Sequence, residues 1–252
     1  MSKEVMKKGS GSVALFADDA ATGFDNMTQD DLALPYVRIL GQLSAQVNEG
    51  DGKYIEGAKP GMIYNNVTHE IFDGKKGIKV VPCYYKKDYP EKSDKGDGNP
   101  LTVATHLPNS PIIKTGKREG SKIRLPNGNY LEETAYYYVL METKAGGMTP
   151  ALITMKSTQL KVSRSWNSMM NSIKLKGKNG LFTPAAYSHV YNLSTVQQSN
   201  DKGTWFGWNV QKIGPVQDKS LYEAAKQFAS SVGNVQVKHG EGETKSKDDV
   251  PF

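Results

Sequence analysis

The sequence predicts a mainly β fold, a small antiparallel barrel or sandwich with two appended α-helices and loose ends. Three observations support this. About seven short β-type runs are separated by Gly, Pro, Asn and Asp turn signals. Only two segments carry a helical period, and strands do not alternate with helices as they do in a parallel α/β sheet. A chain of 252 residues can bury one substantial core.

The first 31 residues are rich in Gly, Ser, Ala and Asp without a sustained period, so we expect a flexible N-terminal segment. A single domain over residues 32–236 follows. The polar stretch 91–100 is expected to be an exposed loop, and Pro126 to Asn129 form the turn of a hairpin. In the first two thirds of the domain, β runs are expected at 34–40, 61–66, 78–86, 122–125, 130–131, 134–141 and 151–155.

A helix is expected to begin near Ser157, because Val162, Trp166, Met169, Met170 and Ile173 fall on one helical face. Two more strands, 187–196 and 204–213, are joined by a polar turn. The last helix lies between Pro215 and Gly233, with Asp218 as its cap and Leu221, Ala225, Phe228 and Val232 as its stripe. Residues 237–252 are charged and aperiodic, so a disordered tether is expected. This pattern favours an OB-like barrel with insertions.

The charge of the chain is unevenly distributed. The net charge is +6, but residues 1–35 carry three lysines against six acids, and residues 237–252 carry three lysines against four acids. The segment between them therefore holds about +10. A basic body between less basic ends is typical of a domain that binds a polyanion, since phosphate neutralisation releases counterions. The alternative is a charge that serves only solubility.

Several classes of function have no support in the sequence. No apolar run has the length of a bilayer span and residues 1–12 lack the core of a signal peptide, so we expect a cytoplasmic protein without membrane contact. Cys83 is expected to be a small buried thiol. Nucleotide-binding, hydrolase and zinc-protease motifs are absent, and the four histidines have no metal-ligand spacing, so neither catalysis nor a cofactor or metal is expected.

The chain ends on its most distinctive motif, Asp248, Asp249, Val250, Pro251 and Phe252. Phe252 offers an aromatic ring together with the free carboxylate. Pro251 limits the conformations of the tip, and the two aspartates suit a basic rim. These properties indicate a peptide that docks in an apolar pocket of a partner protein.

This tip resembles the C-terminal peptide of bacterial single-stranded DNA-binding proteins, which usually end in Asp-Asp-Ile-Pro-Phe, with Val250 in place of isoleucine. Phage single-stranded DNA-binding proteins also tend to end in an acidic tail with a terminal phenylalanine. A chance match at the chain end is on the order of one in a million. The resemblance implies that the tip recruits replication or repair proteins such as a polymerase, helicase or nuclease, and it suggests a phage-encoded protein.

Binding of a single strand without sequence preference needs basic side chains along the backbone and aromatic faces for unstacked bases. Strand alternation selects the aromatic candidates. In 78–87 the even positions, including Tyr84, are expected to face the core, which leaves Lys79, Tyr85 and Lys87 on the other side.

On the same argument, Tyr137 falls on the apolar face of 134–141, and Tyr136 and Tyr138 are expected to be exposed. Trp205 is expected to face outward from 204–213, whereas Trp166 belongs to the core. The competing interpretation for each exposed aromatic is burial, since large aromatics are common in cores.

The densest basic run is expected to clasp phosphates, although it could equally be a solvated hairpin arm. Two basic residues on the polar face of the first helix would flank the groove. The predicted contacts for single-stranded DNA are Lys79, Tyr85, Lys87, Lys114, Lys117, Arg118, Lys122, Arg124, Tyr136, Tyr138, Lys161, Arg164 and Trp205.

The function expected from these features is non-catalytic protection of single-stranded DNA with recruitment of partners through the tip. Two alternatives remain open: a phage recombination mediator that anneals complementary strands, and an interaction module or host inhibitor without DNA binding. An enzyme, most obviously a nuclease, is the third. A homodimer is one oligomeric state that the sequence allows.

Overall fold

The computed structural model describes residues 33–93, 100–201 and 203–234. The chain divides into two units, Met1–Ala33 and Leu34–Phe252, and the fold below is that of the second unit. The segments expected to be flexible, 1–31 and 237–252, lie outside the described residues. The strands are β1 (Tyr36–Ile39), β2 (Ile63–Asn65), β3 (Ile71–Phe72), β4 (Ile78–Lys92), β5 (Thr102–His106), β6 (Lys117–Glu119), β7 (Lys122–Arg124), β8 (Tyr130–Glu132), β9 (Thr134–Glu142), β10 (Met148–Lys156), β11 (Leu175–Gly177), β12 (Gly180–Phe182), β13 (His189–Asn200) and β14 (Gly203–Pro215).

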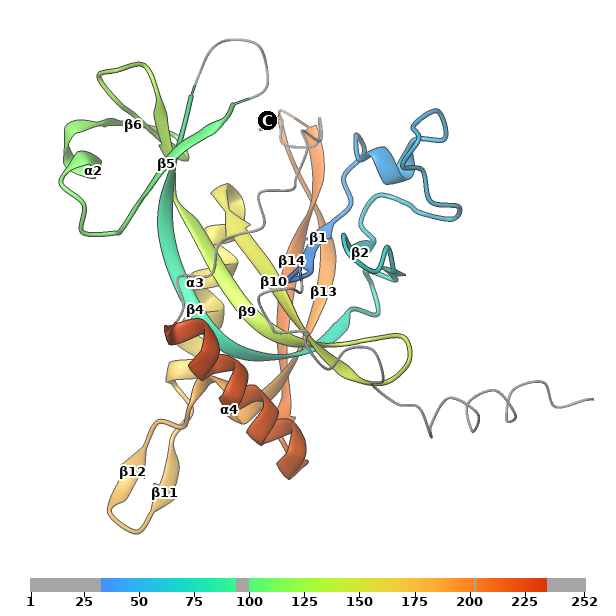
Figure 1. The fold of residues 1–252 in the computed structure, drawn as a ribbon, viewed down its shortest axis with the longest axis vertical. Helices are drawn as coiled ribbons and strands as arrows, with labels where there is room; N and C mark the ends of the chain where they lie inside the picture. Colours follow the sequence, from blue (N-terminus) through green and yellow to red (C-terminus); the bar gives the residue numbers. More distant parts are fainter. Residues whose placement is uncertain (1–32, 94–99, 202, 235–252) are drawn as a thin grey trace, which may run out of the picture. The chain divides into compact units, whose positions relative to one another are not determined.

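The helices are few relative to the strands, so the predicted mainly β class is confirmed (Figure 1). Within the described residues, α4 is the longest of them, and short 3-10 turns connect several strands. The helical elements are η2 (Ala45–Val47), α2 (Ile112–Thr115), η3 (Ser157–Gln159), α3 (Leu160–Asn171), η4 (Ala186–Ser188) and α4 (Lys219–Asn234).

Twelve strands form one sheet, with the order β3-β2-β1-β10-β9-β4-β8-β7-β6 along its main path. β13 pairs with β4 and β14, and β5 pairs with β4. Among the strands that the structure describes, β3 and β14 each pair on one side only, so the ladder does not close. The expected OB-like barrel is therefore not a closed one, and the sheet is open.

β4 joins two parts of this sheet because it is fifteen residues long. Its first part pairs with β9 on one edge and with β13 on the other. Its last residues pair instead with β5 and β8, which belong to a lobe inserted between β4 and β9. The sequence predicted an exposed loop from residue 91, but β4 continues to Lys92 and both Glu91 and Ser93 are buried.

The chain order around β4 is simple. β4, β9 and β10 form an antiparallel meander, α3 follows, and β13 and β14 form a long hairpin whose first strand returns to β4. β1 lies parallel to β10 at the outer side of the meander. The hairpin and the strands of the meander overlap the predicted runs, but β13 continues to Asn200 and β14 begins at Gly203, so residues 199, 200 and 203 of the predicted turn belong to strands.

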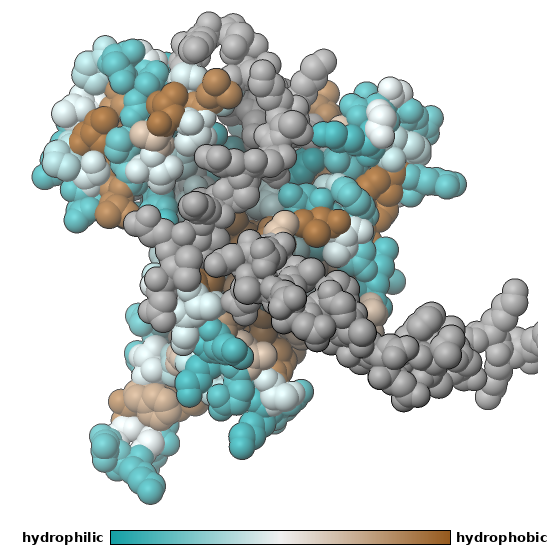
Figure 2. Space-filling model, in the orientation of Figure 1, coloured by the Kyte–Doolittle hydropathy of each residue, from teal (hydrophilic) through white to brown (hydrophobic). Residues whose placement is uncertain are grey.

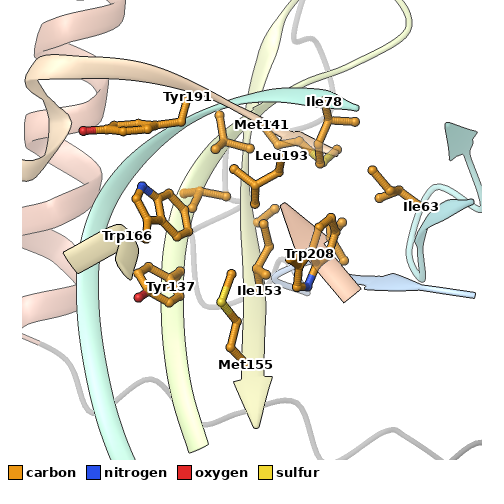
Figure 3. Close-up of a cluster of buried hydrophobic side chains, with 14 of the residues drawn as sticks. Ile63, Ile78, Tyr137, Met141, Ile153, Met155, Trp166, Tyr191, Leu193 and Trp208 are labelled. Carbon is orange, nitrogen blue, oxygen red and sulfur yellow. The ribbon is translucent and has the colours of Figure 1, made fainter. Parts of the chain in front are cut away.

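The main core lies on one face of the meander, beneath α3 (Figure 3). Trp166 stacks on Tyr137 with ring centroids 4.3 Å apart, and Tyr191 packs edge-on against Trp166 at 5.7 Å. The Tyr137 hydroxyl is within 2.8 Å of Ser163 Oγ and donates to Asn167 Oδ1 at 2.9 Å, which ties α3 to β9. The assignment of Trp166 to the core is confirmed, since its side chain is fully buried.

The other face of β4 and β9 is covered by α4. Its predicted stripe is correct: Ala225 packs with Val81 and Cys83, and Val232 packs with Tyr138. Asp218 accepts a hydrogen bond from the Ser220 amide at 2.8 Å, as expected for its cap. Burial raises the pKa of the Cys83 thiol to about 12, so this cysteine stays protonated as the sequence predicted. In the described part of the chain, no helix has the length and hydropathy needed to cross a membrane.

Candidate nucleic-acid interface

β4 forms the exposed end of the sheet face that carries the main core. A bulge between Pro82 and Tyr84 shifts the alternation of this strand by one residue. Tyr85 and Lys87 therefore lie opposite Tyr137 and Ala135, on the same face as the core, whereas Tyr84 lies opposite Tyr138 on the other face. The expectation that Tyr84 is a core residue is wrong: it and Tyr85 are each 37% exposed.

Tyr85 lies at the edge of the core, where one side of its ring is supported. Its ring centroid is 5.2 Å from that of buried Tyr137. Tyr137 in turn is bound to α3, so Tyr85 and α3 share one buried neighbour. An aromatic ring that is packed on one side and open on the other can stack on a base.

Glu133 holds two of the predicted basic residues together. Lys87 Nζ is 3.5 Å from Glu133 Oε1, and Arg118 Nη2 is 3.9 Å from Glu133 Oε2. Burial lowers the pKa of Lys87, but the charges of Tyr89, Glu133 and Tyr85 outweigh it and the pKa is raised. Lys87 is therefore a cation fixed beside Tyr85, at the base of the inserted lobe.

The lobe carries the remaining residues of the basic run. Lys122 lies over the Tyr130 ring at 4.0 Å, and Arg124 lies over the same ring at 5.7 Å. Arg124 also pairs with Glu119 at 3.5 Å. Lys114 in α2 and Lys117 in β6 are exposed. The basic run is thus divided among α2, β6 and β7. Some of its side chains already contact a glutamate carboxylate or the Tyr130 ring.

α3 brings two further predicted residues to the same side of the sheet. Arg164 follows Ser163 and precedes Asn167, the two residues that hold the Tyr137 hydroxyl. Lys161 is one turn earlier, and both basic side chains are exposed. Arg164 therefore lies at the edge of the contact between α3 and β9.

Trp205 on β14 lies near the start of α3. Its indole nitrogen donates to Gln198 Oε1 at 3.0 Å, and its ring is half-buried. Two positions on, Gly207 is buried against Gln159, and the Trp208 amide donates to Gln159 Oε1 at 2.8 Å. Gln159, directly before α3, thus binds the part of β14 that follows Trp205, while Trp205 itself is held to β13 and is less open than expected.

Seven predicted residues do not join this group: four of them, Lys114, Lys117, Lys122 and Arg124, lie in the lobe, and the other three lie elsewhere on the sheet. Tyr138 is 2% exposed, so its predicted exposure is wrong, because α4 covers the face of β9 on which it lies. Tyr136 is half-buried on that face beside Phe228. Lys79 is exposed at the opposite end of β4 and pairs with Glu142 at 2.9 Å.

Sequence reasoning missed Glu133 and the effect of α4. Glu133 follows β8 directly and precedes β9, where no pattern marks a carboxylate that pairs with distant bases. The sequence showed the apolar stripe of α4 but not the sheet face that this stripe covers, because a stripe alone does not identify its packing partner. Alternation then made Tyr136 and Tyr138 look exposed.

We use the following name for the residues that are brought together: the β4–α3 surface comprises Tyr85, Lys87, Arg118, Glu133, Lys161, Arg164 and Trp205.

A family model described as Pam3 phage gp34-like protein matches residues 6–238. The chain belongs to the Pam3 phage gp34-like family. The phage origin suggested by the tip agrees with this match, although the tip itself, 248–252, lies beyond the matched residues.

Neither the curated proteins nor the solved structures contain a match to this gp34-like chain. A function is therefore inferred from the chain's own side chains. Across residues 33–93, 100–201 and 203–234, no group of three or more His, Cys, Asp or Glu side chains is placed to hold a metal ion.

Proposed function

We propose that this phage gp34-like protein binds single-stranded DNA without sequence preference and without catalysis. The observation that carries the proposal is the β4–α3 surface, in which an open tyrosine ring, Tyr85, lies beside Lys87 and Arg118. Base stacking on an aromatic ring and phosphate contacts from basic side chains are the two components of such binding.

The order of the elements supports the proposal. A meander, a helix and a hairpin that returns to the first strand follow the order of an OB fold, which binds oligonucleotides with the loop after its first strand and the loop of its last hairpin. The first of these loops corresponds here to the inserted lobe with Arg118, and the second follows β13, close to Trp205. The middle strands of an OB fold also bind, but α4 covers one face of β9 in this protein.

The C-terminal tip supplies the second part of the proposal. Asp248, Asp249 and Phe252 would dock on replication or repair proteins, such as a polymerase, helicase or nuclease, while the body holds the strand. This part rests on the sequence of the tip and on its similarity to single-stranded DNA-binding proteins.

The test is a titration of the full-length protein with a fluorescent oligo-dT of about 30 nucleotides and with a matched duplex, at low and moderate salt. We expect tight binding to the single strand that weakens as salt rises, with weaker binding to the duplex. Equal binding to both would show general polyanion affinity. No binding to either would contradict the proposal and leave an interaction module as the remaining interpretation.

A further inference from the structure

A hairpin outside the β4–α3 surface extends away from the main sheet. β11 and β12 pair only with each other among the described strands, and they follow α3 in the chain (Figure 1). Every side chain from Lys174 to Thr183 is exposed. Three of them are large and apolar: Leu175 is 42% exposed, Leu181 74% and Phe182 48%. We call residues 174–183 the arm.

The charge of the arm has one sign. It carries Lys174, Lys176 and Lys178 and no acid. The surrounding chain has the same character, since residues 143–200 contain seven Lys or Arg and no Asp or Glu. At the average frequency of acids in this chain, a stretch of that length would hold several. A long acid-free segment favours a polyanionic ligand.

α3 connects the β4–α3 surface to the arm. β10 ends at Lys156, which pairs with Thr134 at the base of the lobe, and α3 begins four residues later. The exposed face of α3 carries Lys161, Arg164 and then Ser168 and Asn171 before Lys174. A helix of twelve residues is roughly 18 Å long, so the basic groups near its start and those of the arm just beyond its end are separated by a length that several nucleotides can span.

The apolar side chains of the arm are arranged for contact with a ligand. Phe182 lies opposite Leu175 in the ladder, and a methyl group at Gly177 would come within 3.2 Å of the Phe182 ring. The glycine thus leaves room for the ring against β11, while nearly half of the side chain stays exposed. Figure 2 shows apolar and hydrophilic surface next to each other on this hairpin.

We propose that the arm is a second contact for the nucleic acid strand, in which Lys176 and Lys178 bind phosphates while Leu181 and Phe182 pack against bases. The inference rests on the proposed function, because it lengthens the path of the same ligand. A second copy of this basic chain would bring like charges to the arm, and three apolar residues form a small area for a protein partner. A nucleic acid satisfies both the lysines and the rings.

A fluorophore on the arm tests this directly. Cys83 is buried and its thiol is protonated, so a maleimide dye will react selectively with Asn179→Cys, an exposed position in the turn of the arm, in the full-length protein. Oligo-dT of about 30 nucleotides should change the emission, whereas an oligonucleotide of about 8 should bind the β4–α3 surface and change it little. The same dye on Gly52→Cys, in an exposed loop, is the control.

A charge variant gives the second measurement. Lys176→Gln with Lys178→Gln should weaken binding of the long oligonucleotide by about tenfold and reduce its salt slope by about 1.4, with little change for the short one. Lys219→Gln with Lys226→Gln removes the same charge from exposed positions of α4 and should have a smaller effect.

The outcomes separate the two proposals. If the wild-type protein binds the long strand but the arm variant binds it equally well and the dye does not respond, the arm inference is overturned and the proposed function stands. If the dye responds to vesicles of anionic lipid and not to the oligonucleotide, the arm is a lipid contact and the inference is also overturned. If the wild-type protein binds no strand of either length, both proposals fail.

Discussion

Tyr84 and Tyr85 are adjacent and equally exposed, yet they lie on opposite faces of β4. Period-two alternation correctly predicted that Tyr85 is exposed, but it placed Tyr84 in the core and Tyr85 on the other side, and the structure reverses these two faces. The bulge at Cys83 explains the difference, because one extra residue transfers every later side chain to the other face. Pro82 is the local signal of this bulge, since a proline inside a strand is confined to edges and bulges, but alternation alone takes no account of it.

Glu91 is a second residue whose environment the sequence concealed, because it begins a polar stretch. Its carboxylate accepts hydrogen bonds from Asn129 at 2.6 Å, from His106 at 2.8 Å and from Asn127 at 3.1 Å. These bonds, the Asn129 bond foremost, hold the pKa of Glu91 below its ordinary value of 4.5. They fasten β5 and the turn after β7 to the end of β4.

Glu91→Gln should therefore destabilise the lobe by about 1–3 kcal/mol at neutral pH, since buried donors lose a charged acceptor. The folded pKa is depressed, so the stabilisation is present above pH 4.5 and is lost as the pH falls through the lowered value. Urea denaturation at pH 7 and pH 3 measures this. Equal stability of the variant and the wild type at both pH values would show that the network contributes nothing.

At the scale of elements, the long periodic segments were predicted well, whereas only some of the short strands were. Of the predicted stripe of α3, Trp166 is buried and Val162, Met169 and Met170 are partly buried against the main core, while Ile173 lies beyond the end of the helix. The short strands β2, β7 and β8 were expected, but β3, β5, β6, β11 and β12 were missed, because strands of two to five residues show no measurable period. Their position depends on β4 and on tertiary pairing, which no local pattern encodes.

Tyr137→Phe tests how α3 is held. The variant keeps the ring that stacks on Trp166 but removes the hydroxyl bound to Ser163 and Asn167. We expect a loss of about 1–2 kcal/mol in the free energy of unfolding and faster hydrogen exchange in α3. Unchanged exchange in α3 would mean that its apolar face alone positions it.

Gly74→Ala tests the contact between β13 and the turns before β2 and β4. Thr195 donates its amide to Gly74 O at 2.7 Å and its hydroxyl to Gly61 O at 2.6 Å. A methyl group at Gly74 would overlap the Gly61 carbonyl and the Thr195 hydroxyl, so we expect a loss of about 3 kcal/mol or more. Thermal unfolding measures it. Gly52→Ala, which meets nothing within 4 Å, is the control and should unfold like the wild type.

For the whole molecule, the sequence predicted the class of the fold and the origin of the protein. The mainly β class agrees with the fold, and the phage origin suggested by the tip agrees with the family. The open sheet and the coverage of β9 by α4 could not be predicted, because both depend on how distant elements pack. The sequence therefore predicted which types of residue form the candidate site, but it predicted the positions of only some of them.

Deleting Val250 to Phe252 tests the division between body and tip. DNA affinity should stay within about twofold of the wild type, because the tip is not part of the β4–α3 surface, while binding to a replication or repair partner should be lost. A pull-down with host replication proteins and an anisotropy titration measure the two properties. Loss of DNA affinity together with partner binding would show that the tip belongs to the binding domain.

The most direct test of the account compares Tyr85→Ala with Tyr84→Ala in an oligo-dT titration. The two variants remove the same group at the same exposure, from opposite faces of one strand. We predict that Tyr85→Ala weakens binding by about 1–3 kcal/mol and that Tyr84→Ala leaves it nearly unchanged. Equal effects of both variants, or an effect of Tyr84→Ala alone, would contradict the assignment of single-strand binding to the β4–α3 surface.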